Sequence, residues 1–231
     1  MPHTTYRYSQ PLNPHAPVFT PSSPNPSTPA FYSTIHPSNR LNVGHINICS
    51  LRHKTHVITK LIDEHCLDLL AVTETWLDSS ISDTEVSVPG TILLRRDRPC
   101  ADGCTCLSSC TPCRKGGGIC IFVKEHVKAK HILDHSHSSL ELMWLRAGTG
   151  KDSTLFGCIY RPPSEPVEFW NRLATSTEQL DGENIVLLGD INVDFLRQTS
   201  SAFHHLKDTL LLPCRLANKV TEATRITGST R

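Results

Sequence analysis

Beyond residue 40 the sequence alternates between short apolar runs and segments in which apolar residues recur three and four positions apart. The second spacing predicts helices over about 54–65, 166–180 and 203–211. The short apolar runs predict strands over about 41–48, 67–72, 91–94, 118–123, 140–145, 154–160 and 185–188. Strands that alternate with helices indicate an α/β domain.

Residues 1–40 show neither pattern. They are rich in Pro, Ser, Thr and Asn and contain no apolar run, so we expect a disordered tail there and one domain over 41–231. The tail lacks the basic and apolar regions of a secretory signal. No stretch of the chain reaches the roughly 18 consecutive apolar residues of a membrane span. We therefore expect an intracellular protein without a membrane partner.

Polar residues that are capable of catalysis or metal binding follow the apolar run at 185–188. Asp190 and Asn192 are two positions apart, so in an extended segment their side chains point the same way. A carboxylate and an amide in this arrangement can hold a water, a metal or a phosphate oxygen. The alternative is an Asp/Asn turn without a function, because both residue types favour turns.

Three further strands also end in polar groups. Asn47 lies near the end of the first strand, Glu74 follows the second, and the strand at 154–160 ends in Tyr160 and Arg161. Each has an ordinary structural explanation on its own, as a turn residue, a surface acid or a packed aromatic. Open α/β folds, however, build their active sites at strand ends. The combination therefore favours one shared site.

In this order the motifs resemble the endonuclease/exonuclease/phosphatase superfamily, and most closely the endonuclease domain of non-LTR (LINE-type) retrotransposons. The resemblance rests on Asn47-Ile-Cys-Ser-Leu-Arg52, Thr73-Glu-Thr-Trp-Leu77, Gly116-Gly-Gly118, Tyr160-Arg-Pro-Pro163 and Gly189-Asp-Ile-Asn192. It implies a two-sheet α/β sandwich, DNase I-like, with helices on the outer faces. It also implies hydrolysis of phosphate esters with a divalent metal, Mg²⁺ or in its place Mn²⁺.

The resemblance further implies a role for each residue. Glu74 and Asn47 would hold the metal, which suits their hard oxygen atoms. Asp190 would orient or deprotonate the attacking water. Asn192 would hold the phosphate, and Tyr160 would contact the scissile phosphate. His45 is given a structural role.

The resemblance implies that the partner is DNA and that the protein acts in the nucleus. It also implies a monomeric domain that was originally fused to a reverse transcriptase. The net charge of +1 gives no general argument for nucleic acid. Phosphate contacts need only a few basic residues on one face, and the candidates are Arg52, Lys115 and Arg161. Such basic residues are more often simply solvated.

Five of the ten cysteines lie between Cys100 and Cys113. Only Cys110 and Cys113 have the Cys-x-x-Cys spacing of a zinc site, so we expect an incidental exposed loop over 99–114, with zinc binding as the alternative. The other five lie in or beside apolar runs and are expected to be small core residues; they are Cys49, Cys66, Cys120, Cys158 and Cys214.

One expected motif has no counterpart. The related endonucleases carry a late Ser-Asp-His motif, and no Asp-His pair follows Asp190. We therefore expect a C-terminally truncated domain whose final strands are missing and which nicks DNA poorly. The alternatives are a catalytically dead remnant with weak nucleic-acid or zinc binding, and a phosphoinositide-type phosphatase of the same superfamily.

Overall fold

A computed structural model of the chain describes residues 41–98, 116–132, 139–148, 153–180 and 182–220. The expected tail at 1–40 and the cysteine-rich insert at 99–114 lie outside these residues. No helix in the described ranges is long and apolar enough to cross a membrane.

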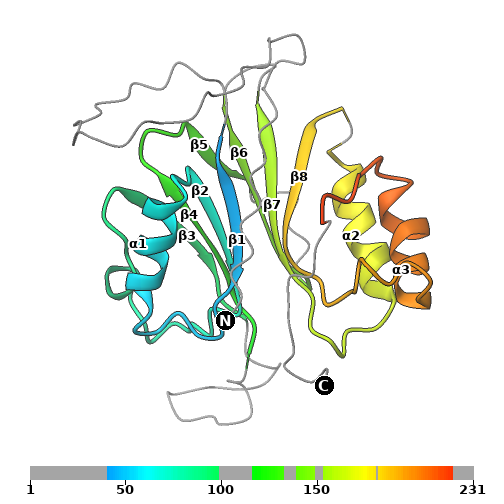
Figure 1. Cartoon of the computed structure of the whole chain (residues 1–231), viewed down its shortest axis with the longest axis horizontal. Coiled ribbons are helices and arrows are strands. Elements are labelled where there is room, and N and C mark those ends of the chain that lie inside the picture. Colours follow the sequence, from blue (N-terminus) through cyan, green and yellow to red (C-terminus); the bar gives the residue numbers. More distant parts are fainter. Residues whose placement is uncertain (1–40, 99–115, 133–138, 149–152, 181, 221–231) are drawn as a thin grey trace, which may run out of the picture.

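Two four-stranded mixed sheets form the centre of the domain (Figure 1). The first sheet has the order β1 (Val43–Asn47), β2 (Leu69–Thr73), β4 (Ile119–Lys124) and β3 (Thr91–Arg96). The second has the order β5 (Ala129–Ile132), β6 (Glu141–Ala147), β7 (Thr154–Tyr160) and β8 (Asn184–Asp190). Within each sheet one neighbouring pair is parallel, β1 with β2 and β7 with β8.

Helices make the connections that parallel strands require. Helix α1 (Thr55–Glu64) joins β1 to β2, and α2 (Glu168–Glu178) joins β7 to β8. After β8 come α3 (Ser201–Leu206) and the π-helical turn η4 (Lys207–Leu211). Figure 1 shows α1 on one outer side of the paired sheets and α2 with α3 on the other. The expected two-sheet α/β sandwich is confirmed.

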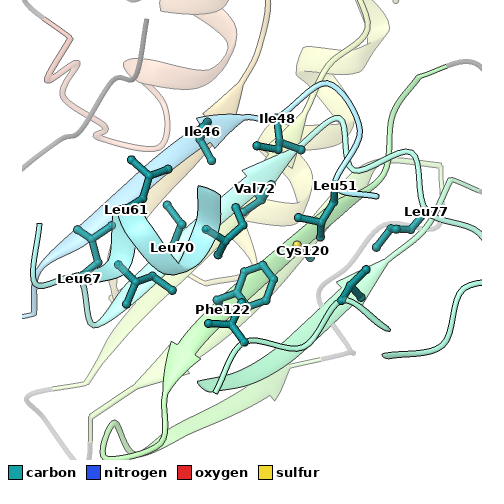
Figure 2. Packing of buried hydrophobic residues seen from close by; sticks show 14 of the residues in the cluster. Ile46, Ile48, Leu51, Leu61, Leu67, Leu70, Val72, Leu77, Cys120 and Phe122 are labelled. Carbon is teal, nitrogen blue, oxygen red and sulfur yellow. The ribbon is translucent and has the colours of Figure 1, made fainter. Parts of the chain in front are cut away.

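The alternation of side chains along β2 explains how the first sheet is buried on both faces. Leu70 and Val72 point outward and pack with α1 residues such as Leu61 (Figure 2). Leu69 and Ala71 point the other way, into the core between the sheets. Successive residues of a strand face opposite sides, so an uninterrupted apolar run is needed when both sides are covered.

Strand β7 has the same role in the second sheet, and all of its residues are buried. Phe156, Cys158 and Tyr160 lie between the sheets, whereas Leu155 and Ile159 pack toward α2 and α3. Tyr160 therefore ends a strand with its ring already inside the sandwich. This placement matters for the site described below.

Two elements were not predicted from the sequence. Strand β5 lies at a sheet edge and its residues are only partly buried or exposed, so it carries no apolar run. The 3-10 turn η1 (Asp83–Glu85) has no buried residue. The helix expected over 203–211 is divided into α3 and η4. Elements that bury little leave little trace in the apolar pattern.

Strand β8 pairs with β7 alone among the described strands. Ile185, Val186 and Leu187 are only partly buried, and with Leu206 and His45 they line an apolar cavity of about 420 Å³. The cavity lies between β8, the first half of β1 and the chain from the end of α3 onward.

The cysteine prediction is correct for two of the five residues outside the insert and wrong for two. Cys120 and Cys158 are buried, but Cys49 and Cys66 are exposed and Cys214 is intermediate. Cys49 and Cys66 have positive φ values of 47° and 49°, at the turns that follow β1 and α1. They stand next to apolar runs in the sequence, yet the chain reverses there and leaves them outside.

Thiol labelling should reflect this difference. Burial raises the pKa of Cys158 to about 12 and also raises that of Cys120. Because the thiolate is the reactive form, iodoacetamide should modify Cys49 and Cys66 at least about a hundredfold faster than the two buried residues. Peptide mass spectrometry at successive times measures the rates. Equal rates in the folded protein would contradict the core described here.

Candidate active site

The ends of four strands meet at one edge of the sandwich. Because β1 is parallel to β2, and β7 to β8, each pair brings its carboxyl ends to the same side. Two hydrogen bonds then join the sheets. The amide nitrogen Nδ2 of Asn47 donates to Oδ2 of Asp190 at 2.9 Å, and the Tyr160 hydroxyl donates to Oε1 of Glu74.

Backbone hydrogen bonds on both sides hold the segment that carries Glu74. The Ser50 N–H donates to the Glu74 carbonyl at 2.8 Å, and the Trp76 N–H donates to the Gly117 carbonyl at 2.9 Å. Glu74 and Trp76 have φ values of 58° and 53°, in the left-handed region. This conformation costs about 1–2 kcal/mol for a residue with a side chain. Strain that is maintained in this way is characteristic of functional sites.

The Glu74 carboxylate accepts three hydrogen bonds. The donors are the Tyr160 hydroxyl, the Trp76 indole N–H at 2.5 Å and the Gly117 backbone N–H at 2.9 Å. Burial raises the pKa of Glu74, but these three donors and the nearby Arg98 charge outweigh it, and the net effect is a lowered pKa. Glu74 is therefore ionised at neutral pH and can bind a cation.

The triple-glycine motif forms a turn that packs against this carboxylate. Gly117 and Gly118 have φ values of 79° and 81°. A Cβ on Gly117 would lie 2.2 Å from the guanidinium carbon of Arg98 and would displace that side chain, and the positive φ of Gly117 favours glycine in any case. The motif is thus explained by packing around Glu74.

Glu141 is a site residue that the sequence analysis missed. Its carboxylate accepts hydrogen bonds from Arg98 Nε and from the Gly118 N–H, both at 2.5 Å. The Arg98 guanidinium in turn lies over the Tyr160 ring, 5.6 Å from its centre. A lone acid at the start of an otherwise apolar strand was the available signal.

Tyr160 keeps its proton at neutral pH. Burial raises the pKa of its hydroxyl, and so does the hydrogen bond to the negative Glu74. Tyr160 can therefore serve as a hydrogen-bond donor and not as a base.

Asp190 is fixed from two sides. Oδ2 accepts from Asn47, and Oδ1 accepts from the Asn192 backbone N–H at 3.0 Å. The Asn192 side chain donates to the Arg161 carbonyl at 2.8 Å, and the Arg161 N–H donates to the Asp190 carbonyl at 2.9 Å. The structure thus brings together Asn47, Glu74, Tyr160, Asp190 and Asn192 in one region.

The predicted DNA-contacting residues are placed differently. The guanidinium of Arg161 lies 5.0 Å from the ring centre of Trp170 and 5.7 Å from that of Phe169, and it donates to the Glu165 carbonyl. These contacts give it a structural role at α2. Arg52 is exposed, and its charge adds to the Ser82 hydrogen bonds that mainly lower the pKa of Glu85. Lys115 lies outside the described residues, and DNA contact by all three stays a prediction.

His45 is held beside the site. Its Nε2 lies 3.1 Å from the Thr73 hydroxyl. Burial lowers the pKa of His45 to about 4, an effect that the Asp190 charge partly offsets. The imidazole is consequently neutral at pH 7, in agreement with the structural role expected for it.

The available oxygen donors fit magnesium. Among the described residues, no group of three or more His, Cys, Asp or Glu side chains is arranged to hold a metal. Mg²⁺ does not need such a group, since it commonly binds one or two carboxylates and keeps several waters. Glu74, with Asn47 nearby, offers oxygen ligands of this kind. A zinc site, by contrast, calls for His and Cys ligands in greater number.

Comparison with known proteins adds evidence on the fold. No protein-family model and no curated protein match this chain. Several solved structures, however, match this chain. The endonuclease domain of TRAS1, a telomere-specific non-LTR retrotransposon, superposes with a TM-score of 0.53 at 12% identity, over 74% of this chain and 71% of that one.

Two further enzymes match to a similar extent. An AP endonuclease from Archaeoglobus fulgidus gives a TM-score of 0.51 at 17% identity, over 74% of this chain and 70% of its own. The 3′ phosphatase NExo from Neisseria, solved with a product DNA hairpin, gives 0.52 at 14% identity with the same two coverages.

The chain therefore shares the DNase I-like fold of these solved structures, which is the fold that the resemblance implied. At these identities the likeness establishes the fold. Activity has to be argued from the site.

Proposed function

We propose that this chain is a Mg²⁺-dependent phosphodiesterase domain that nicks DNA, of the kind found in non-LTR retrotransposons. The observation that supports this most directly is the pair of hydrogen bonds across the sandwich, Asn47 to Asp190 and Tyr160 to Glu74. They join four residues from four strands at one edge of the fold. No packing requirement explains two carboxylates there.

Each residue has a role in this chemistry. Mg²⁺ bound by Glu74 and Asn47 would offset negative charge on the phosphoryl oxygens. Asp190 accepts one hydrogen bond on each oxygen, which leaves further lone pairs to orient and deprotonate a water. The Tyr160 hydroxyl has a single proton, which it donates to Glu74 in this structure, so it would turn from Glu74 to donate to a phosphate oxygen. Asn192 is fixed beside Asp190 as a further phosphate contact.

A supercoiled-plasmid assay tests the proposal. Protein in excess over plasmid makes slow cleavage detectable as well. Nicked circles should form with Mg²⁺ and not with EDTA. Intact plasmid in both conditions would favour the dead-remnant alternative. Release of inorganic phosphate from a phosphoinositide, without nicking, would favour the phosphatase alternative.

Replacement of Tyr160 by phenylalanine should slow Mg²⁺-dependent nicking about a hundredfold, because one preorganised donor in a hydrolytic site has an effect of this size. The ring, which is 4% exposed, should still fill the core and leave the melting temperature nearly unchanged. Initial nicking rates and thermal melts measure both quantities. An unchanged rate would exclude the hydroxyl from the reaction.

A further inference from the structure

Trp76 differs from the other large aromatic residues. Among the large apolar side chains that are exposed in the described part of the chain, it is the one aromatic, at 46% exposure. Trp144 and Trp170, in contrast, are 0% and 2% exposed. Apolar burial stabilises a fold, so a tryptophan left in solvent brings little of that benefit.

The backbone of Trp76 is also held in a conformation that costs energy. Its φ of 53° is a strained conformation for a residue with a side chain, and the bond from its N–H to the Gly117 carbonyl maintains it. Its indole N–H donates to Oε2 of Glu74 at 2.5 Å. The ring is therefore held in one place beside the Glu74 carboxylate, with much of its surface free.

Positive charge lies along the same rim. The loop after β1 is joined to the Glu74–Trp76 segment, because the Leu51 N–H donates to the Thr75 carbonyl at 2.9 Å. The exposed Arg52 follows directly. Lys54 donates to the carbonyls of Ile48 and Cys49, both at 2.9 Å, and so places its ammonium close to Asn47.

We propose that the Trp76 ring is a stacking platform for an unpaired nucleobase of the DNA substrate, next to the phosphate that Glu74 and Tyr160 address. This inference rests on the proposed function and adds a substrate preference to it. Aromatic rings beside basic residues bind single-stranded nucleic acid in this way, because every base has a π-face. DNA whose bases are unstacked at the cleavage position should bind best.

Quenching of tryptophan fluorescence tests this contact, because a stacked base quenches the ring that it touches and Trp144 and Trp170 are buried out of its reach. The full chain is titrated in EDTA, which keeps the DNA intact, with a fluorescein-labelled single strand of about 12 nucleotides. A fully paired hairpin of the same sequence is the comparison. The single strand should quench the fluorescence and bind more tightly, with affinity measured by anisotropy.

Three variants separate stacking from a structural role. Trp76→Leu should weaken binding of the single strand about tenfold to a hundredfold, the range for one stacked base. Trp76→Phe keeps an aromatic face but loses the N–H to Glu74, so it should bind within about threefold of the natural chain. Leu212→Ala, at another exposed apolar residue, should have no effect.

The outcomes distinguish this inference from the proposed function. Unquenched fluorescence at saturation, or equal binding by Trp76→Leu and the natural chain, would overturn the stacking role even if the plasmid is nicked. An equal loss in Trp76→Phe and Trp76→Leu would show that the indole serves only to hold Glu74. Quenching and stacking without nicking would leave this inference standing and remove the proposed activity. Absence of DNA binding, by a chain that sediments as a dimer, would contradict both the stacking role of Trp76 and the proposed function.

Discussion

Asp190→Ala is expected to lower the rate of Mg²⁺-dependent plasmid nicking by at least about a hundredfold to a thousandfold, the effect of removing one preorganised catalytic group. Asp190 ends β8, and its two oxygens are oriented by Asn47 and by the Asn192 N–H. Alanine leaves these donors without an acceptor and the water without a base. The measurement is the initial rate of nicked-circle formation, with protein in excess.

A matched control keeps the comparison specific. Asp208 is an exposed acid on η4, so Asp208→Ala removes the same charge away from the strand ends and should nick at the natural rate. Thermal melts of both variants show whether the fold is retained. Nicking by Asp190→Ala at the rate of the control would mean that the cleavage does not come from this site.

Gly189→Ala should cause the largest loss of stability among single substitutions near the site. A Cβ at this position would lie 1.8 Å from the backbone carbonyl oxygen of Ile159, its partner in the β7–β8 pair. That atom belongs to the backbone and cannot turn aside as a side chain could. We expect a loss of about 3 kcal/mol, the upper part of the range for overpacking.

The expected loss can be measured by thermal or urea unfolding. For a chain of this size each kcal/mol corresponds to roughly 2–4 °C in melting temperature. Gly90→Ala is the matched control, because Gly90 also has a positive φ, 71°, but nothing lies within 4 Å of its Cβ position. The control should lose only about 1 kcal/mol from backbone strain. Similar losses in both variants would contradict the close approach of β7 and β8.

Gly189→Ala should also reduce nicking by more than its stability loss explains. The Ile159–Gly189 pair directly precedes the Tyr160–Asp190 pair in the strand register. A forced separation at the first pair therefore displaces both site residues at the second. This is the physical reason for a glycine before the aspartate in the Gly189-Asp-Ile-Asn192 motif.

Much of the fold could be predicted from the sequence because most elements bury an apolar face. Strands β2 and β7 are continuous apolar runs, and both are covered on two sides. Helix α1 was expected over 54–65 and observed over Thr55–Glu64, since Ile58, Leu61 and Ile62 alone define its buried stripe. Strand β5, which buries little, could not be predicted in this way.

The residues of the candidate site were also accessible from the sequence, but their partners were not. Strand ends supplied Asn47, Glu74, Tyr160 and Asp190 as separate suggestions. That Asn47 bonds Asp190, 143 positions away, depends on how the two sheets pack against each other. The same packing places Glu141 beside the glycine turn. The packing of α2 on the outer face of the second sheet places Trp170 against the Arg161 guanidinium.

The sequence by itself thus determined the elements, the α/β class and the identity of the polar residues at strand ends, because apolar periodicity and turn residues act locally along the chain. Only the tertiary structure decided which polar groups meet, which cysteines are buried and why three glycines adjoin Glu74. Those outcomes depend on contacts between residues far apart in the chain. The exposed position of the Trp76 ring was also decided by the tertiary structure, since the Glu74 carboxylate and the adjoining glycine turn hold the ring in place.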